Sequence, residues 1–265
     1  MQTNKIALIA GGFLVVLLGA GFFLWRGTVG EGLVSNPFPI VSLNGTTTEN
    51  GSPDGANTVE VGSAPVGVPQ PSLERVIPVA SPDLSATARE VTVKYLNTSV
   101  ENLRKDPLAY QDWVNLGLAR QMLGDYAGAE EVWVYATKLS PTTSIAFSNL
   151  GYLYMVYIKN GAKSEASYKQ ALTLNSKDTN SYRSLAELYT YHYKKGTNAV
   201  EIILKEGILK NPDAYDLGVL LARYYVEKGM IAEAKTVYTA AASSARSAGK
   251  VDVATSIETE RDALK

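Results

Sequence analysis

The chain has 265 residues, enough for one or two domains, and its hydrophobic content of 46% is that of an ordinary globular protein. Its formal net charge of -1 favours neither a nucleic-acid partner nor a broadly acidic partner surface. The chain contains a single histidine and no cysteine, which excludes disulfides, thiolate metal sites and thiol nucleophiles.

The first predicted element is a membrane-spanning helix over Ile6–Trp25, within an anchor segment of residues 1–26. The helix carries no charge between Lys5 and Arg26, and it would span roughly 30 Å, the thickness of a bilayer core. A cleaved signal peptide is the alternative, but its apolar region would be shorter, and no A-x-A site follows here. Few Lys or Arg residues follow Arg26 before the folded domain, so the positive-inside rule predicts a single-pass cell-membrane protein with that domain outside the cytoplasm.

Residues 27–82 form a predicted linker. They hold eight of the eleven prolines and many Gly, Ser, Thr and Asn residues. Such a composition offers too few bulky apolar side chains to offset the entropy of ordering, so we expect a disordered tether before a folded domain at 83–265. The first helix of that domain is predicted to begin at Ser81-Pro82, with Ser as the N-cap, and to end at Lys105 before Asp106-Pro107.

A helix-turn-helix pattern follows between Tyr110 and Thr143. Apolar or small residues recur every three or four positions on both sides of Gly124-Asp125, which predicts two amphipathic helices joined by a turn. The residues that carry the pattern are Trp113, Leu116, Gly117, Gly124, Ala129, Trp133, Ala136 and Pro141. Their order and spacing resemble the tetratricopeptide repeat (TPR) signature, with Arg120 in place of the usual Tyr and Trp133 in place of Phe. The resemblance implies an all-α solenoid of stacked helix pairs.

Three more repeats follow the same order of residues. The small residue of the first helix recurs as Gly117, Gly151, Ala186 and Ala222. The spacing lengthens in the second and third repeats, and we expect the extra residues in the turns at Lys159–Gly161 and Lys194–Thr197. A last helix over Val251–Leu264 has the polar outer face of a terminal cap. The predicted fold is therefore a TPR helix-turn-helix solenoid of about four repeats with capping helices, behind one transmembrane helix.

The TPR resemblance also implies where a partner would bind. In this family the first helix of each repeat lines a concave groove that holds a peptide or a helix of another protein. The corresponding residues of this chain are Gln111, Gln121, Met122, Ser148, Asn149, Tyr152, Met155, Asn180, Arg183, Glu187, Tyr191 and Arg223. We expect Tyr152, Met155 and Tyr191 to anchor a partner, with its acidic groups near Arg183 and Arg223. The alternative is that the aromatic side chains pack within the solenoid.

The sequence offers little for catalysis. The stretch Gly161-Ala162-Lys163-Ser164 lacks the upstream glycines of a phosphate-binding loop, and His192 has no second histidine or cysteine with which to share a metal. We therefore predict no enzymatic activity, no cofactor, no metal and no nucleic-acid partner. The groove also differs from TPR domains that clamp acidic C-termini, because Val114 and Leu118 stand where that subtype has Lys and Asn.

Together these expectations describe a membrane-tethered TPR scaffold or adaptor that binds a protein or peptide partner in its groove. In outline it is similar to bacterial membrane-anchored TPR proteins of envelope assembly and secretion, a similarity of architecture alone. The alternative is a structural subunit that forms a homo-oligomer through contacts between solenoids or between transmembrane helices. A soluble fragment that stays monomeric would favour the adaptor.

Overall fold

The computed structural model describes residues 67–78 and 84–265. The predicted transmembrane helix at Ile6–Trp25 and residues 27–66 of the predicted linker lie outside these ranges. Within the two described ranges, no helix is both long enough and apolar enough to cross a membrane. The helices, including two short π-helical segments η1 and η2, are α1 Ala86–Lys105, α2 Tyr110–Met122, α3 Tyr126–Leu139, α4 Ile145–Tyr152, η1 Leu153–Tyr157, α5 Gly161–Leu174, α6 Thr179–Glu187, η2 Leu188–His192, α7 Ala199–Lys210, α8 Tyr215–Glu227, α9 Ile231–Ser247 and α10 Val251–Asp262.

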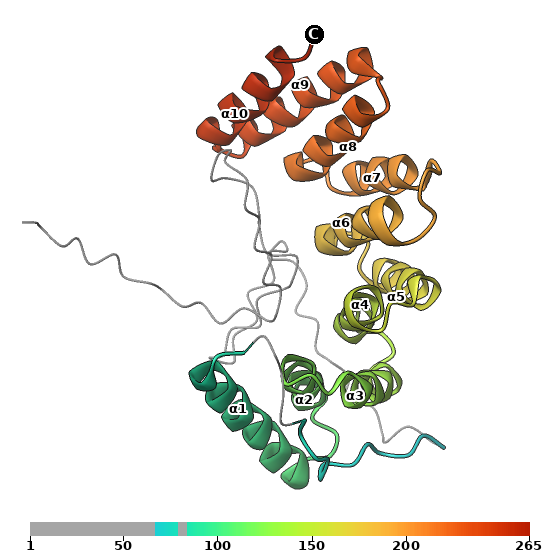
Figure 1. The fold of residues 1–265 in the computed structure, drawn as a ribbon, viewed down its shortest axis with the longest axis vertical. Coiled ribbons are helices and arrows are strands. Elements are labelled where there is room, and N and C mark those ends of the chain that lie inside the picture. The colour runs from blue at the N-terminus through green and yellow to red at the C-terminus, as the bar shows by residue number, and fades with distance from the viewer. Residues whose placement is uncertain (1–66, 79–83) are drawn as a thin grey trace, which may run out of the picture.

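Consecutive helices pair and stack into a curved array (Figure 1). Helix α2 packs on α3, α4 on α5, α6 on α7 and α8 on α9, and each pair contacts the next. Helices α2, α4, α6 and α8 lie along the inner side of the curve, and α3, α5 and α7 along the outer side. Helix α1 covers α2 at one end, and α10 covers α9 at the other. This arrangement confirms the predicted all-α solenoid of helix pairs between capping helices.

Small residues allow the two helices of a repeat to approach closely. A Cβ atom added to Gly117 would lie 2.3 Å from Nε1 of Trp133, and one added to Gly151 would lie 2.7 Å from Cδ1 of Tyr168. The Trp133 ring is fully buried against this gap, and its Nε1 donates a hydrogen bond of 3.0 Å to the carbonyl of Val114. In repeats one and two, the small residue of the inner helix thus lies against a large ring of the outer helix, as the repeat pattern predicts.

A repeated tyrosine–glutamate hydrogen bond joins neighbouring repeats. In each case a Tyr hydroxyl near the end of an inner helix donates to a Glu near the start of the preceding repeat's outer helix. The three bonds run from Tyr154 to Glu130 at 2.8 Å, from Tyr189 to Glu165 at 2.7 Å and from Tyr225 to Glu201 at 2.9 Å. Each Glu also pairs with a lysine, respectively Lys163, Lys194 and Lys205. The same polar link therefore fixes the stacking at three successive junctions.

The extra residues of repeats two and three were expected in turns, but the structure accommodates them partly inside helices. The inner helices of these repeats end in the π-helical segments η1 and η2, where Ile158 N donates to Leu153 O at 3.0 Å and Tyr193 N to Leu188 O at 2.7 Å. A π turn holds one more residue than an α turn, so it takes up an insertion without breaking the helix. The following turns contain Lys159 and Lys194 at φ 58° and 59°.

Helix α1 begins later than predicted. The sequence suggested Ser81 as the N-cap, whereas Ser85 caps the helix, with its Oγ accepting a hydrogen bond of 3.2 Å from Ala88 N. Leu84 and Ser85 are not helical, and residues 79–83 lie outside the described ranges. Either serine satisfies the sequence rule for an N-cap, so the pattern alone does not distinguish them. The end at Lys105 is as predicted.

Residues 67–78, which we call the strap, differ most from expectation. The sequence assigns them to a disordered linker, but they lie against α1, α2 and α3 (Figure 1, cyan). Leu73 and Ile77 pack on the core formed by these helices, and Pro71 is buried. The Arg75 Nε atom lies 2.7 Å from Oδ2 of Asp125, and its Nη1 lies 3.2 Å from Oε2 of Glu131. The ordered domain therefore includes the strap.

Arg120 connects the strap to the first repeat. It occupies the position at which the later repeats carry Tyr154, Tyr189 and Tyr225, but no Glu among the described residues before it forms the corresponding bond. Its Nη2 donates instead to the carbonyl of Ser72 at 2.5 Å, and only 3% of the residue is exposed. Burial lowers the pKa of Arg120, although Asp125 favours its charged form. The strap thus provides the polar partner that a preceding repeat would otherwise provide.

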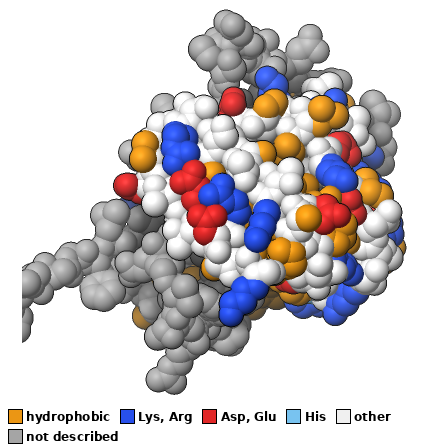
Figure 2. Space-filling view, turned by 90° about the horizontal axis from the view of Figure 1, so that it is seen from above, with side chains coloured by type: hydrophobic (Ala, Val, Ile, Leu, Met, Phe, Trp, Pro, Cys, Tyr) orange, Lys and Arg blue, Asp and Glu red, His pale blue; other side chains and the backbone are white. Residues whose placement is uncertain are grey.

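The opposite end of the solenoid is closed by α10. Ile257 is fully buried and packs with Val253 and Leu264 against α8 and α9, as predicted for the inner face of a cap. The outer surface carries interleaved acidic and basic side chains (Figure 2). Among them, Nη1 of Arg246 lies 2.8 Å from Oε1 of Glu258. A charged outer surface keeps the exposed end of a repeat stack soluble.

Candidate protein-binding groove

The inner helices α2, α4, α6 and α8 form one wall that runs along the curve (Figure 1), and we call it the inner wall. The predicted groove residues divide by exposure. Those with partly or fully exposed side chains are Gln111, Met122, Ser148, Asn149, Asn180, Arg183, Glu187, Tyr191 and Arg223. Those that are buried are Gln121, Tyr152 and Met155. The wall therefore offers mainly polar side chains, with Tyr191 as its most exposed aromatic.

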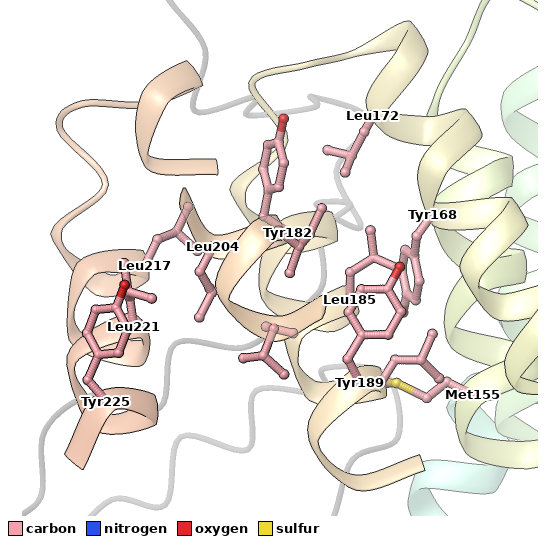
Figure 3. Close-up of a cluster of buried hydrophobic side chains, with 14 of the residues drawn as sticks. Met155, Tyr168, Leu172, Tyr182, Leu185, Tyr189, Leu204, Leu217, Leu221 and Tyr225 are labelled. Carbon is pink, nitrogen blue, oxygen red and sulfur yellow. The ribbon is translucent and has the colours of Figure 1, made fainter. Parts of the chain in front are cut away.

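Two of the three expected anchors belong to the core. Tyr152 is 8% exposed and Met155 is 2% exposed, and both join the large cluster that links repeats two, three and four. Met155 lies beside Leu185 and Tyr189 in that cluster (Figure 3). Their helix is apolar nearly all round, so the neighbouring repeat closes over the side that the family pattern assigns to the groove. The alternative reading, packing within the solenoid, is correct for these two residues.

Arg183 is already engaged within the wall. Its Nη2 forms a short ion pair with Oδ2 of Asp216, and its Nη1 donates to Oδ1 of Asn180 at 2.9 Å. Its side chain is mostly buried. The pair links α6 to the first turn of α8, so this guanidinium stabilises the stacking of repeats three and four. It does not have the free charge that the sequence interpretation gave it.

Arg223 is engaged in the same way at the C-terminal end. Its Nη2 donates to Oε1 of Glu260 at 2.8 Å and its Nε to Oε2 at 3.1 Å, a bidentate arrangement with α10. The hydroxyl of Tyr238 donates to the same carboxylate at 3.1 Å. The hydrogen bonds to Glu260 raise the pKa of Arg223. Both arginines expected to attract an acidic partner are therefore neutralised by the protein itself.

Glu187 and Tyr191 remain as accessible functional groups near the middle of the wall. Tyr191 is 60% exposed and lies in η2, four residues beyond Glu187. Glu187 is half-buried, and this burial raises the pKa of its carboxyl group. In the two described ranges, no residue forms an ion pair or a hydrogen bond with its side chain. Both are among the residues that the TPR resemblance assigns to the groove.

Sequence reasoning missed an aromatic cluster formed by Tyr126, Tyr152 and Tyr157. Tyr126 and Tyr157 stack with ring centroids 4.3 Å apart and planes at 23°. Tyr157 also meets Tyr152 edge-on, with centroids 5.8 Å apart. Tyr157 lies in η1, where the wider turn shifts the helical register away from the one that the TPR pattern assumes. The only signal in the sequence was that the spacing of repeat two is longer than the TPR pattern, which indicates a shifted helical register.

Groups for metal or acid–base chemistry are sparse in the described part of the chain. No group of three or more His, Asp or Glu side chains is placed there to hold a metal ion. The exposed His192 has its pKa lowered by partial burial and by the nearby charges of Lys159 and Lys195. The geometry of the wall suits contact with another molecule along its length.

The chain was compared with known protein families, sequences and solved structures, and it resembles solved structures only in fold. No protein-family model and no curated protein sequence matches the chain. The crystal structure of MamA aligns with 63% of this chain and 98% of its own, at 18% identity and a TM-score of 0.50. The crystal structure of yeast Tom70 also aligns with 63% of this chain, and with 42% of its own, at 18% identity and a TM-score of 0.36. At this level of identity, the likeness to MamA is one of fold.

Proposed function

The chain has the tetratricopeptide-repeat fold, which it shares with MamA, and from this fold we propose that it is a protein-binding scaffold. The observation that carries the proposal is the inner wall itself. The four inner helices present polar and aromatic side chains along one face, from Gln111 in repeat one to Arg223 in repeat four. A curved array of this kind offers one extended surface to a long partner segment. The partner is a peptide or a helix of another protein.

The finer part of the proposal concerns location. The uncharged stretch Ile6–Trp25 is a membrane anchor, and the solenoid stands outside the cytoplasm at the end of a tether. The scaffold then serves a membrane-associated assembly, such as envelope assembly or secretion, and carries no enzymatic activity. The support is the hydropathy of the N-terminal sequence and its scarcity of positive charge before the repeats.

Photo-crosslinking from single positions of the full-length chain tests which face binds. A photoreactive residue at Asn149 or Tyr191 probes the inner wall, whereas one at Gln170 or Leu209 probes exposed positions of the outer helices. We expect crosslinks to a partner protein from the first two positions and none from the outer pair. Crosslinks from the outer pair alone would assign the binding face to the other side. Crosslinks only to a second copy of the chain would support a self-assembling structural subunit.

The proposed anchor is tested separately. The full-length chain should remain with membranes after alkaline carbonate washing, whereas a variant without Ile6–Trp25 should be released. Protease added outside intact cells, after permeabilisation of any outer barrier, should degrade the solenoid if it is extracytoplasmic. Release of the intact chain by carbonate would contradict the anchor and leave the binding proposal standing.

A further inference from the structure

The charges of the inner wall are not balanced. Each of its arginines is engaged inside the protein: Arg120 with the strap, Arg183 with Asp216 and Arg223 with Glu260. Helix α4 and segment η1 carry no charged residue. The acidic residues that remain without an ion pair among the described residues are Asp112, Glu187 and Glu227. The charge left over for a partner is therefore negative, the opposite of what the sequence suggested.

Glu187 is the most distinctive of the three residues. Asp112 already accepts a hydrogen bond of 3.0 Å from Asn102, and Glu227 is exposed to water at the end of α8. Glu187 lies partly buried at the end of α6, one of the two central helices of the wall, where water stabilises its charge less. A carboxylate in that position without a partner costs free energy, and an incoming cation would recover it.

An exposed aromatic ring near Glu187 also suits a cation. Burial raises the pKa of both Tyr152 and Tyr168, and the negative charge of Glu187 adds to the effect, but both rings are buried in the core and are not open to a partner. The exposed ring of Tyr191 lies about one helical turn further along. Aromatic faces attract Lys and Arg side chains, and more strongly where water is partly excluded.

We propose that Glu187 receives a Lys or Arg side chain of the partner segment that lies along the inner wall. This inference rests on the proposed function and adds the partner's chemistry: a segment with at least one basic residue, whose charged group pairs with Glu187 beside Tyr191. The neighbouring wall of α4 and η1 is uncharged, so the residues that flank the basic one are polar or apolar. An acidic segment would face Glu187 and Glu227 with like charge.

Selection of random peptides displayed on phage tests the proposal on the full-length chain in detergent micelles. We expect the selected peptides to share a Lys or Arg. Glu187→Gln, which keeps the shape and removes the charge, should weaken their binding by about ten-fold or more, as loss of a charge-assisted contact implies. The matched control is Glu233→Gln on the exposed face of α9, which should leave binding unchanged. Circular dichroism verifies that each variant retains its helices.

Charge reversal distinguishes an ion pair between Glu187 and the basic residue of the peptide from long-range attraction by the overall charge of the wall. Glu187→Lys should reject the basic peptides and should bind versions of them in which the shared Lys or Arg is replaced by Glu. A photoreactive residue at Tyr191 reports whether peptides sit on the inner wall. Peptides that crosslink there but bind Glu187→Gln as well as the original would overturn this inference alone. Absence of any peptide crosslinked to the wall would overturn both this inference and the proposed function.

Discussion

Replacing Arg120 by Met should release the strap while leaving the solenoid folded. Met keeps most of the length of the buried stem and removes the donors, so the carbonyl of Ser72 loses the guanidinium 2.5 Å away. A hydrogen bond from a charged group contributes about 1.5–3 kcal/mol, which corresponds to a roughly 10- to 150-fold larger open fraction of the strap. The ion pair of Arg75 with Asp125 remains and keeps the strap near its place.

Tryptic cleavage after Arg75 measures this opening. Cleavage of a segment that opens and closes rapidly follows its open population, so the rate should rise by the same roughly 10- to 150-fold. The control is Arg223→Met, which removes an equally well-paired arginine at the far end of the solenoid and should leave cleavage at Arg75 unchanged. An unchanged rate in Arg120→Met would refute the view that this residue holds the strap.

Three further outcomes follow from the packing and the ion pairs. Trp133→Ala should lower the free energy of unfolding by about 3–5 kcal/mol in urea, because the ring is fully buried; a loss below about 1 kcal/mol would contradict the repeat register. Gly117→Ala should cost about 1–3 kcal/mol through overlap with that ring, and combining it with Trp133→Phe should restore part of the loss. Burial opposes ionisation of Glu165, but hydrogen bonds from two lysines and Tyr189 outweigh it and lower its pKa to about 2. The ionised Glu165 carboxylate therefore contributes its full stabilisation to the folded state above the unfolded-state pKa, and this contribution is lost as the pH falls from about 4.5 towards 2. Glu165→Gln should therefore reduce the dependence of the urea unfolding midpoint on pH over that range.

The repeat architecture could be predicted because its signal is the spacing of residues within each pair of adjacent helices. The pairing of Gly117 with Trp133 needs only the spacing of a small and a large residue along two adjacent helices, and the same spacing recurs along the chain. The cap at Ile257 follows from an apolar stripe with polar neighbours. Such patterns can be recognised in the sequence without knowing which distant residues are in contact.

The strap could not be predicted from its own composition. Pro-rich sequence with isolated Leu73 and Ile77 has the character of a linker, and its order depends on partners that follow much later in the chain. The one clue was Arg120, a charged residue where the repeat pattern has Tyr. The repeat pattern does not predict that Arg120 donates a hydrogen bond to a backbone carbonyl 48 residues upstream.

For the candidate groove, the sequence indicates which helices face inward but not how their charged side chains are paired within the protein. The TPR resemblance assigned the first helix of each repeat to the inner side, where it lies, but it could not show that Tyr152 and Met155 are covered by the next repeat. It also could not show that Arg223 is paired with a residue 37 positions later in α10. Both facts depend on how repeats stack, which the sequence of one repeat does not specify.

The strap determines how mechanical load would enter the solenoid. A pull applied at Gly67 meets the contacts of Ser72 and Arg75 with the first repeat before it reaches α1. Because Ser72 and Arg75 both precede α1 in the chain, both contacts bear the tension before it passes along the backbone to α1. Tension from the N-terminal side is therefore distributed over the first helix pair, and α1 is shielded from being peeled away by its own first turn.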